Sequence, residues 1–202
     1  MTATTTPMPT LATVLWPSST QQDQARALLR ALVLAVAGSL LMTLSAKIQI
    51  PFWPVPMTMQ TFVVLVLGIA YGWRLGAATM LLYLIEGAAG LPVFSGTPER
   101  GIGLAYMMGP TGGYLVGFVL AAALCGWLAE RGWDRTLGRV TVAMLAGHAL
   151  ILACGVLWLA NIMGWDKAIQ FGLTPFWAAT AFKTALAVAT LPLAWRLLGR
   201  RG

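Results

Sequence analysis

The sequence predicts an all-α, polytopic membrane protein with six transmembrane helices and both termini in the cytoplasm. Of its 202 residues, 58% are hydrophobic and 9% are charged, and the mean hydropathy is +0.78. Because soluble domains average about 25% charged residues, this composition excludes a soluble enzyme, a nucleic-acid-binding module and a disordered chain. A membrane-spanning helix needs about 20 residues, so the chain has room for about six.

Six apolar segments, separated by Gly, Pro and charged residues, are predicted to form these helices. They cover residues 27–46, 58–70, 75–90, 111–129, 140–160 and 176–198. Pro175 stands where a helix start tolerates proline, whereas Pro192 is expected to kink or loosen the last helix. Residues 1–25 are expected to form a flexible cytoplasmic tail, with a short turn around residues 11–16, ahead of a membrane domain over 26–202. The outer loops are predicted at about 47–57, 91–110 and 161–175.

The basic residues are unevenly distributed between the two sides of this predicted bundle. With the N-terminus in the cytoplasm and six alternating spans, nine of the 13 Lys and Arg residues fall on the cytoplasmic side. These are Arg26, Arg30, Arg74, Arg131, Arg135, Arg139, Arg196, Arg200 and Arg201. Lys47, Arg100 and Lys167 fall outside, and Lys183 lies within the last span. The excess follows the positive-inside rule, which puts both termini in the cytoplasm.

The chain offers little for metal or cofactor chemistry. Cys125 and Cys154 fall inside apolar segments and are interpreted as buried thiols rather than as a disulfide or a metal cluster. His148 lies in the fifth span without a second His, Cys or carboxylate at ligand spacing, which favours a hydrogen-bonded packing role. No cofactor is therefore expected.

The first outer loop is unusually stiff. Pro51, Pro54 and Pro56 forbid a helix and keep the backbone extended. Together with Phe52 and Trp53 they form an apolar segment that is either a lid over a cavity or an aromatic anchor at the membrane interface.

The second outer loop is rich in glycine, which permits close backbone approach and leaves amide groups free to bind a ligand. Its glycine spacing fits neither a dinucleotide-binding fingerprint nor a phosphate-binding loop. Thr111, near its end, is equally well explained as the N-cap of the fourth helix.

Three segments near these loops carry a family resemblance. They are PVPMTMQT (54–61), GLPVFSG (90–96) and GPTGGYLVGF (109–118). In this order they resemble the signature segments of BioY, the biotin-specific substrate-binding (S) component of energy-coupling-factor (ECF) transporters. The resemblance covers about residues 26–198.

The resemblance implies a six-helix protein in the cell membrane of a prokaryote that captures biotin from outside with high affinity. It also implies an ECF coupling protein and ATPase subunits as partners, which drive reorientation and release inward. The 202 residues contain no ATP-binding motif, so ATP hydrolysis is expected from another chain. Biotin, membrane lipid and these subunits are the expected partners, and nucleic acid is not.

Lys183 is the strongest candidate for a ligand contact. A lysine inside an apolar span is costly and normally faces a cavity or a partner; snorkelling is the weaker alternative, because the cytoplasmic end is far away. The family's last helix has an Asp-x-x-Lys pattern whose lysine matches Lys183, but the Asp position holds Thr180, which hydrogen-bonds without supplying charge. Glu86, in the third span, is the hypothesised substitute, as partner of Lys183 or as ureido acceptor. A protonated or interface-exposed carboxyl is the alternative.

Biotin combines a polar ureido ring, an apolar sulfur ring and a carboxylate, so its site needs an apolar wall and a few placed polar groups. Arg100, in the second loop, is a candidate for the carboxylate, and the loop amides or an exposed Arg without ligand are the alternatives. Gln60 and Asn161 are polar side chains near outer helix ends, suited to bind ligand or to satisfy backbone groups. The candidate walls are Tyr114, Trp53, Phe52 and Phe94.

Ala27, Ala31 and Ala35 recur every four residues on the first predicted helix and form one flat face. In lipid, small residues at this spacing let two helices approach closely. S components share such a pattern for the coupling protein, so the resemblance implies a docking surface. Packing within the chain is the alternative.

Two other functions remain open. One is an S component for a different vitamin, which the departure at Thr180 leaves possible. The other is a membrane-embedded enzyme that uses Glu86, His148 or Lys183, although these residues lie on different spans at different depths. The sequence therefore predicts a transport subunit rather than an enzyme.

Overall fold

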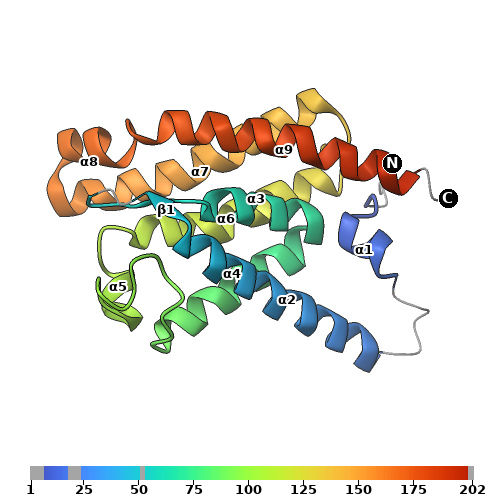
Figure 1. Cartoon of the computed structure of the whole chain (residues 1–202), viewed down its shortest axis with the longest axis horizontal. Helices are drawn as coiled ribbons and strands as arrows, with labels where there is room; N and C mark the ends of the chain where they lie inside the picture. Colours follow the sequence, from blue (N-terminus) through green and yellow to red (C-terminus); the bar gives the residue numbers. More distant parts are fainter. Residues whose placement is uncertain (1–6, 18–23, 51–52, 200–202) are drawn as a thin grey trace, which may run out of the picture.

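The computed structural model describes residues 7–17, 24–50 and 53–199, and helices dominate it (Figure 1). The four longest are α2 (Gln24–Lys47), α6 (Gly112–Ala129), α7 (Leu137–Met163) and α9 (Phe176–Gly199). Two shorter helices, α3 (Gln60–Tyr71) and α4 (Trp73–Ala88), follow one another with only Gly72 between them. All six coincide with segments that the apolar pattern predicted, so the mainly helical fold is confirmed.

Four of these helices, α2, α6, α7 and α9, are long and apolar enough to cross a membrane. The chain is accordingly a multi-pass helical membrane protein. Helix α3 has 12 residues and α4 has 16, fewer than the roughly 20 that a span perpendicular to the bilayer needs.

Helix α6 lies at the centre of the bundle, where it packs against α7, α3 and α4. Small residues make this close approach possible. A Cβ added to Gly68 of α3 would lie 2.5 Å from Ala122 O of α6, and one added to Gly126 would lie 2.4 Å from the backbone of Gly72. Glycine at these positions therefore lets α3 and α4 fold back over α6. The turn between α3 and α4 depends on Gly72, whose φ of 82° disfavours other residues.

Short elements gather at the end of the bundle where α2 finishes and α3 begins (Figure 1). They are strands β1 (Gln49–Ile50) and β2 (Met57–Thr58) and helices α5 (Gly103–Met107) and α8 (Trp165–Gly172). The strands pair antiparallel, with Gln49 opposite Thr58 and Ile50 opposite Met57. All four elements belong to the regions around the predicted outer loops, which thus contain local structure that the apolar pattern did not predict.

Helix α1 (Leu11–Leu15) lies at the opposite end of the molecule (Figure 1). Arg30 of α2 donates a hydrogen bond from Nη2 to Ala12 O at 2.7 Å, and Met8 N donates to Glu130 O at 2.7 Å. The side chain of Leu11 is buried. The turn expected around residues 11–16 is thus a docked helix. The division of the chain at residue 25 stays a prediction.

Helix α9 continues through Pro192 to Gly199. Near its end, Trp195 Nε1 donates a hydrogen bond to Asp134 Oδ2 at 2.7 Å, and the Arg135 guanidinium lies 4.5 Å from the centre of the Trp195 ring. Burial raises the pKa of the Asp134 carboxyl. These contacts attach the connection between α6 and α7 to the last helix.

Candidate binding site

A small cavity of about 40 Å³ lies near the end of the bundle that carries β1 and β2, so a ligand larger than a few water molecules fits only when the lining moves apart. It is lined by Val55, Pro56, Thr58, Gln60, Thr61, Phe94, Ser95, Tyr106, Thr111, Tyr114, Leu115, Phe118, Phe176 and Lys183. Most of these side chains are apolar or aromatic. Among the lining residues, Lys183 alone carries a formal charge.

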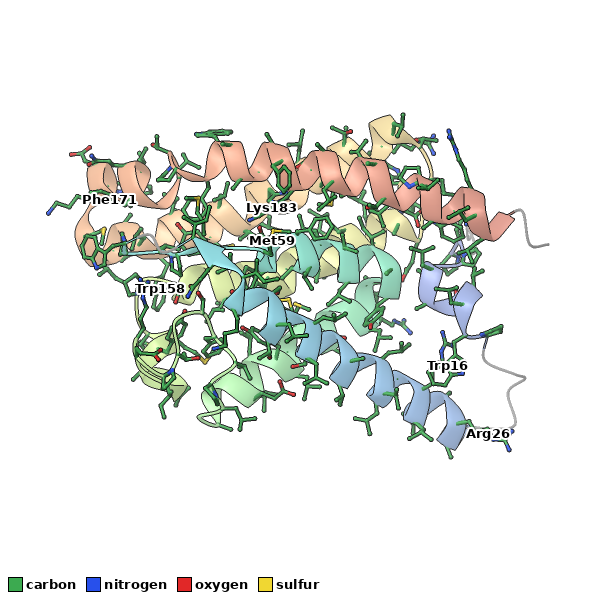
Figure 2. All side chains as sticks on the ribbon, viewed as in Figure 1. Trp16, Arg26, Met59, Trp158, Phe171 and Lys183 are labelled. Carbon is green, nitrogen blue, oxygen red and sulfur yellow. The ribbon has the colours of Figure 1, made fainter. Side chains whose placement is uncertain are left out.

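Lys183 reaches this cavity from α9. Only 5% of its surface is exposed. Its Nζ donates hydrogen bonds to Thr58 O at 2.7 Å and to Thr61 Oγ1 at 2.8 Å. Figure 2 shows it beside Met59, where α3 begins. Because a lysine ammonium has three N–H donors, these two neutral partners leave one donor for an acceptor atom in the cavity.

Hydrogen bonds from buried tyrosines fix the segment between α4 and α5. Gln60, at the start of α3, donates from Nε2 to Tyr83 OH at 2.7 Å, and Tyr83 OH donates to Val93 O at 3.0 Å. Tyr106 OH of α5 donates to Ser95 O at 2.8 Å, and burial raises the pKa of Tyr106. These bonds position the side chains of this segment that line the cavity.

One wall of the cavity is an aromatic cluster around Phe94. Its ring stacks on Tyr106 with centroids 4.9 Å apart and meets Tyr83 edge-on at 5.4 Å. The ring also lies directly against Gly87 of α4, where an added Cβ would come within 2.0 Å of Phe94 Cζ. The Phe94 ring can therefore occupy this position only because residue 87 is glycine.

Tyr114 of α6 forms another part of the lining. Its hydroxyl donates to Gly172 O at the end of α8 at 2.7 Å, and its ring lies 6.1 Å from that of Phe176. Space for the ring comes from Gly155 of α7, where an added Cβ would lie 2.2 Å from Tyr114 Cε1. Tyr114 thus links α6 to α7, α8 and α9 at the cavity.

Four of the predicted site residues, Lys183, Gln60, Tyr114 and Phe94, line the cavity together. Thr180 does not. It lies on a separate apolar groove formed by α7, α8 and α9, which His148 also lines. The His148 ring is buried, with Nδ1 2.9 Å from Met144 O of its own helix.

Glu86 is also absent from the cavity lining. Its carboxylate accepts a hydrogen bond from the hydroxyl of Ser39, which is buried on α2. The bond joins α4 to α2, and the hypothesised pairing of Glu86 with Lys183 is not present in this structure, in which the Lys183 partners are Thr58 and Thr61.

Arg100, Trp53 and Asn161 are exposed and do not line the cavity. Asn161 Nδ2 donates to Leu157 O of its own helix at 2.7 Å. Trp53 is 68% exposed and meets Phe171, labelled in Figure 2, edge-on at 6.1 Å. Phe52, the other predicted aromatic wall in this loop, lies outside the described residues.

The three alanines of the stripe on α2 differ in how far they are buried. Ala27 is exposed, Ala31 is half-buried and Ala35 is buried. Ala27 and Ala31 line a space whose other side is formed by Ala12 and Thr13 of α1. The exposed end of the stripe therefore faces α1.

Sequence reasoning missed several polar groups of the cavity. Thr58 and Thr61 hold Lys183, and Ser95 and Tyr106 contribute from the second outer segment. Thr58, Thr61 and Ser95 do lie inside the three segments that carry the family resemblance. Those segments were the available signal, although nothing in them distinguished a cavity-facing hydroxyl from any other.

Comparison with known proteins agrees with the resemblance. The model of the BioY family matches residues 17–200. The "Probable biotin transporter BioY" of Pyrococcus horikoshii is 38% identical over 148 residues, which are 73% of this chain and 85% of that protein. The "Biotin transporter BioY" of Thermotoga maritima is 38% identical over 150 residues, again 73% of this chain and 85% of the relative.

A solved structure shares the fold. It is the crystal structure of the S-component for biotin from an ECF-type ABC transporter, with a TM-score of 0.70, 20% sequence identity, and coverage of 89% of this chain and 95% of that one. Together with a family model that matches nearly the whole chain, these similarities show that the protein belongs to the BioY family.

Proposed function

We propose that this protein is the biotin-binding S component of an ECF-type transporter and that it takes up biotin rather than catalysing a reaction on it. The observation that carries the proposal is the buried ammonium group of Lys183 in an otherwise uncharged, largely apolar cavity. The relatives are named as biotin transporters, which supports biotin as the ligand.

The lining matches the three chemical parts of biotin. Aromatic side chains such as Phe94 and Tyr114 provide a wall for the apolar sulfur ring. The remaining N–H of Lys183 suits an anionic or carbonyl oxygen of the ligand, because a hydrogen bond from a charged donor is about twice as strong as one between neutral groups. Gln60 and the threonine hydroxyls supply further polar contacts for a ureido ring.

We propose six transmembrane spans, with both termini on the cytoplasmic side of a prokaryotic plasma membrane. Support comes from the arrangement in Figure 1, where α2 begins and α9 ends at the same end of the molecule. The unequal distribution of basic residues gives the orientation. The cavity then lies near the outer surface, and the proline-rich first loop covers it once biotin has entered.

The proposed partners are a transmembrane coupling protein and ATPase subunits, which would drive reorientation and inward release. The stripe of Ala27, Ala31 and Ala35 is the proposed docking surface. Helix α1 stands opposite its exposed end, so a partner helix that approaches Ala27 and Ala31 from that side has to displace α1.

The test is equilibrium binding of labelled biotin to the purified full-length protein, with other vitamins as competitors. The wild type is expected to bind biotin in preference to the competitors. Lys183→Met is expected to weaken binding by about 10- to 100-fold, since a hydrogen bond to a charged group contributes about 1.5–3 kcal/mol.

Lys167→Met is the matched control, because Lys167 is an exposed lysine of α8 outside the cavity. Equal affinity of the Lys183→Met variant and the wild type would show that the cavity is not the biotin site. Preferential binding of another vitamin would instead identify an S component of different specificity.

A further inference from the structure

Lys47, the last residue of α2, holds a backbone turn of the second outer segment. Its Nζ lies 3.0 Å from Pro92 O, 3.1 Å from Phe94 O and 3.2 Å from Thr97 O. The hydroxyl of Thr97 is a further neighbour at 3.3 Å. Three carbonyl dipoles thus converge on one ammonium, whose three N–H donors match them in number.

The two chain segments that this contact joins both border the cavity. From Lys47 the chain runs through β1 into the first outer loop, which lines the cavity with Val55 and Pro56. The turn that Lys47 holds lines it with Phe94 and Ser95. Lys47 itself does not line the cavity, so any effect on a ligand passes through these neighbours.

The turn has little other support from regular structure. The described residues between α4 and α5, 89–102, include neither a helix nor a strand. The turn is instead held by side chains. The hydroxyls of Tyr83 and Tyr106 donate hydrogen bonds to its carbonyls at Val93 and Ser95. A hydrogen bond from the Ser95 hydroxyl to the Gln49 side chain joins the turn to β1. Of these anchors, Lys47 brings the charge, and charge-assisted bonds are about twice as strong as neutral ones.

We propose that Lys47 is a positioning residue of the binding site, which ties the end of α2, and with it β1, to the turn at 92–97 beside the cavity and thereby slows ligand dissociation. The inference rests on the proposed function, because it assumes that biotin occupies the cavity. A movement that separates the end of α2 and β1 from the turn at 92–97 removes these carbonyls from Lys47. A ligand that leaves by such a movement has to wait until the bonds break.

The experiment measures association and dissociation rates of labelled biotin for the wild type and for Lys47→Met, Lys47→Gln, Lys47→Arg and Lys167→Met, together with thermal unfolding of the ligand-free proteins. Lys47→Met and Lys47→Gln are expected to release biotin at least about 10-fold faster with little change in association, given the usual strength of a bond to a charged group. Lys47→Arg, which also donates to carbonyls, is expected to restore most of the slow release. Lys167→Met is expected to behave as the wild type.

Wild-type release rates in both Lys47→Met and Lys47→Gln would overturn the proposal. So would a change confined to association, since that indicates attraction of an anionic ligand from a distance rather than closure of the two segments. A loss of folded protein with an unchanged release rate in the remaining fraction would show a merely structural role. Failure of the wild type to bind biotin at all would reject the proposed function instead.

Discussion

Individual charged side chains inside an apolar chain have to find specific partners, because an unpaired ion in hydrocarbon is costly. Lys183 finds a carbonyl and a hydroxyl at the start of α3, which satisfy two of its donors and leave the third for another acceptor. The carboxyl of Glu86 finds a serine hydroxyl on α2. The two residues therefore occupy separate polar sites, although the sequence suggested that they act together.

Glu86→Gln tests whether Glu86 takes part in ligand binding. Because the carboxylate contacts Ser39 and does not line the cavity, we expect the affinity for biotin to stay within about 2-fold of the wild type, well below the effect of losing a bond to a charged group. The measurement is equilibrium binding of labelled biotin. A loss comparable to that of Lys183→Met would support the original hypothesis that Glu86 replaces the missing aspartate.

At the scale of secondary-structure elements, the central position of α6 depends on residues without side-chain bulk. Gly126 lies against the turn between α3 and α4, where an added Cβ would be 2.4 Å from both Gly72 C and Trp73 N. Backbone atoms cannot move aside as the end of a flexible side chain can. The contact is therefore close to its steric limit, and the position of α3 and α4 over α6 follows from it.

Gly126→Ala is expected to destabilise the protein by about 1–3 kcal/mol, the usual cost of overpacking, and hence to lower the thermal unfolding temperature in detergent. Gly138→Ala is the matched control, since Gly138 also lies in a helix but an added Cβ there meets nothing within 4 Å. Both substitutions replace a helical glycine by alanine, which favours the helix, so the difference between the two variants reports mainly the cost of packing. Equal unfolding temperatures for the two variants would contradict the packing argument.

At the scale of the whole molecule, the number of membrane spans depends on whether α3 and α4 cross the bilayer. Neither reaches the length of an ordinary span, yet the two helices meet at Gly72 and pack on the centrally placed α6. Helices of this length are able to cross where the bilayer thins locally or where flanking residues extend to the interface. If α3 and α4 both cross, the chain has six spans, and its two termini lie on the same side of the membrane.

Labelling of single cysteines in intact cells decides this point, after Cys125 and Cys154 have been replaced by alanine. Arg74 is an exposed residue at the start of α4, and Glu99 is an exposed residue beyond its end. A membrane-impermeant thiol reagent is expected to label Glu99→Cys from outside and Arg74→Cys only after the cells are permeabilised. Labelling of Arg74→Cys in intact cells would mean that α3 and α4 do not cross.

The apolar pattern predicted the helical segments well, because the preference of about 20 consecutive apolar residues for a membrane helix is a local property of the chain. Prediction of the site was less complete. Lys183, Gln60, Tyr114 and Phe94 line the cavity, whereas Thr180, Glu86, Arg100, Trp53 and Asn161 do not. Thr180 lies one helical turn from Lys183, yet its side chain is on a different face of α9. It therefore lines the groove toward α7 and α8.

By itself, the sequence determined that this protein is a bundle of membrane helices with a lysine in its last span and a family signature in its loops. Each of these features depends on residue types and spacing along the chain. The tertiary structure alone decided which polar groups share the cavity, because that depends on how each helix is rotated and on contacts between distant segments. The hydrogen bonds of Lys183 to Thr58 and Thr61, and of Lys47 to the turn at 92–97, join residues that sequence spacing does not relate.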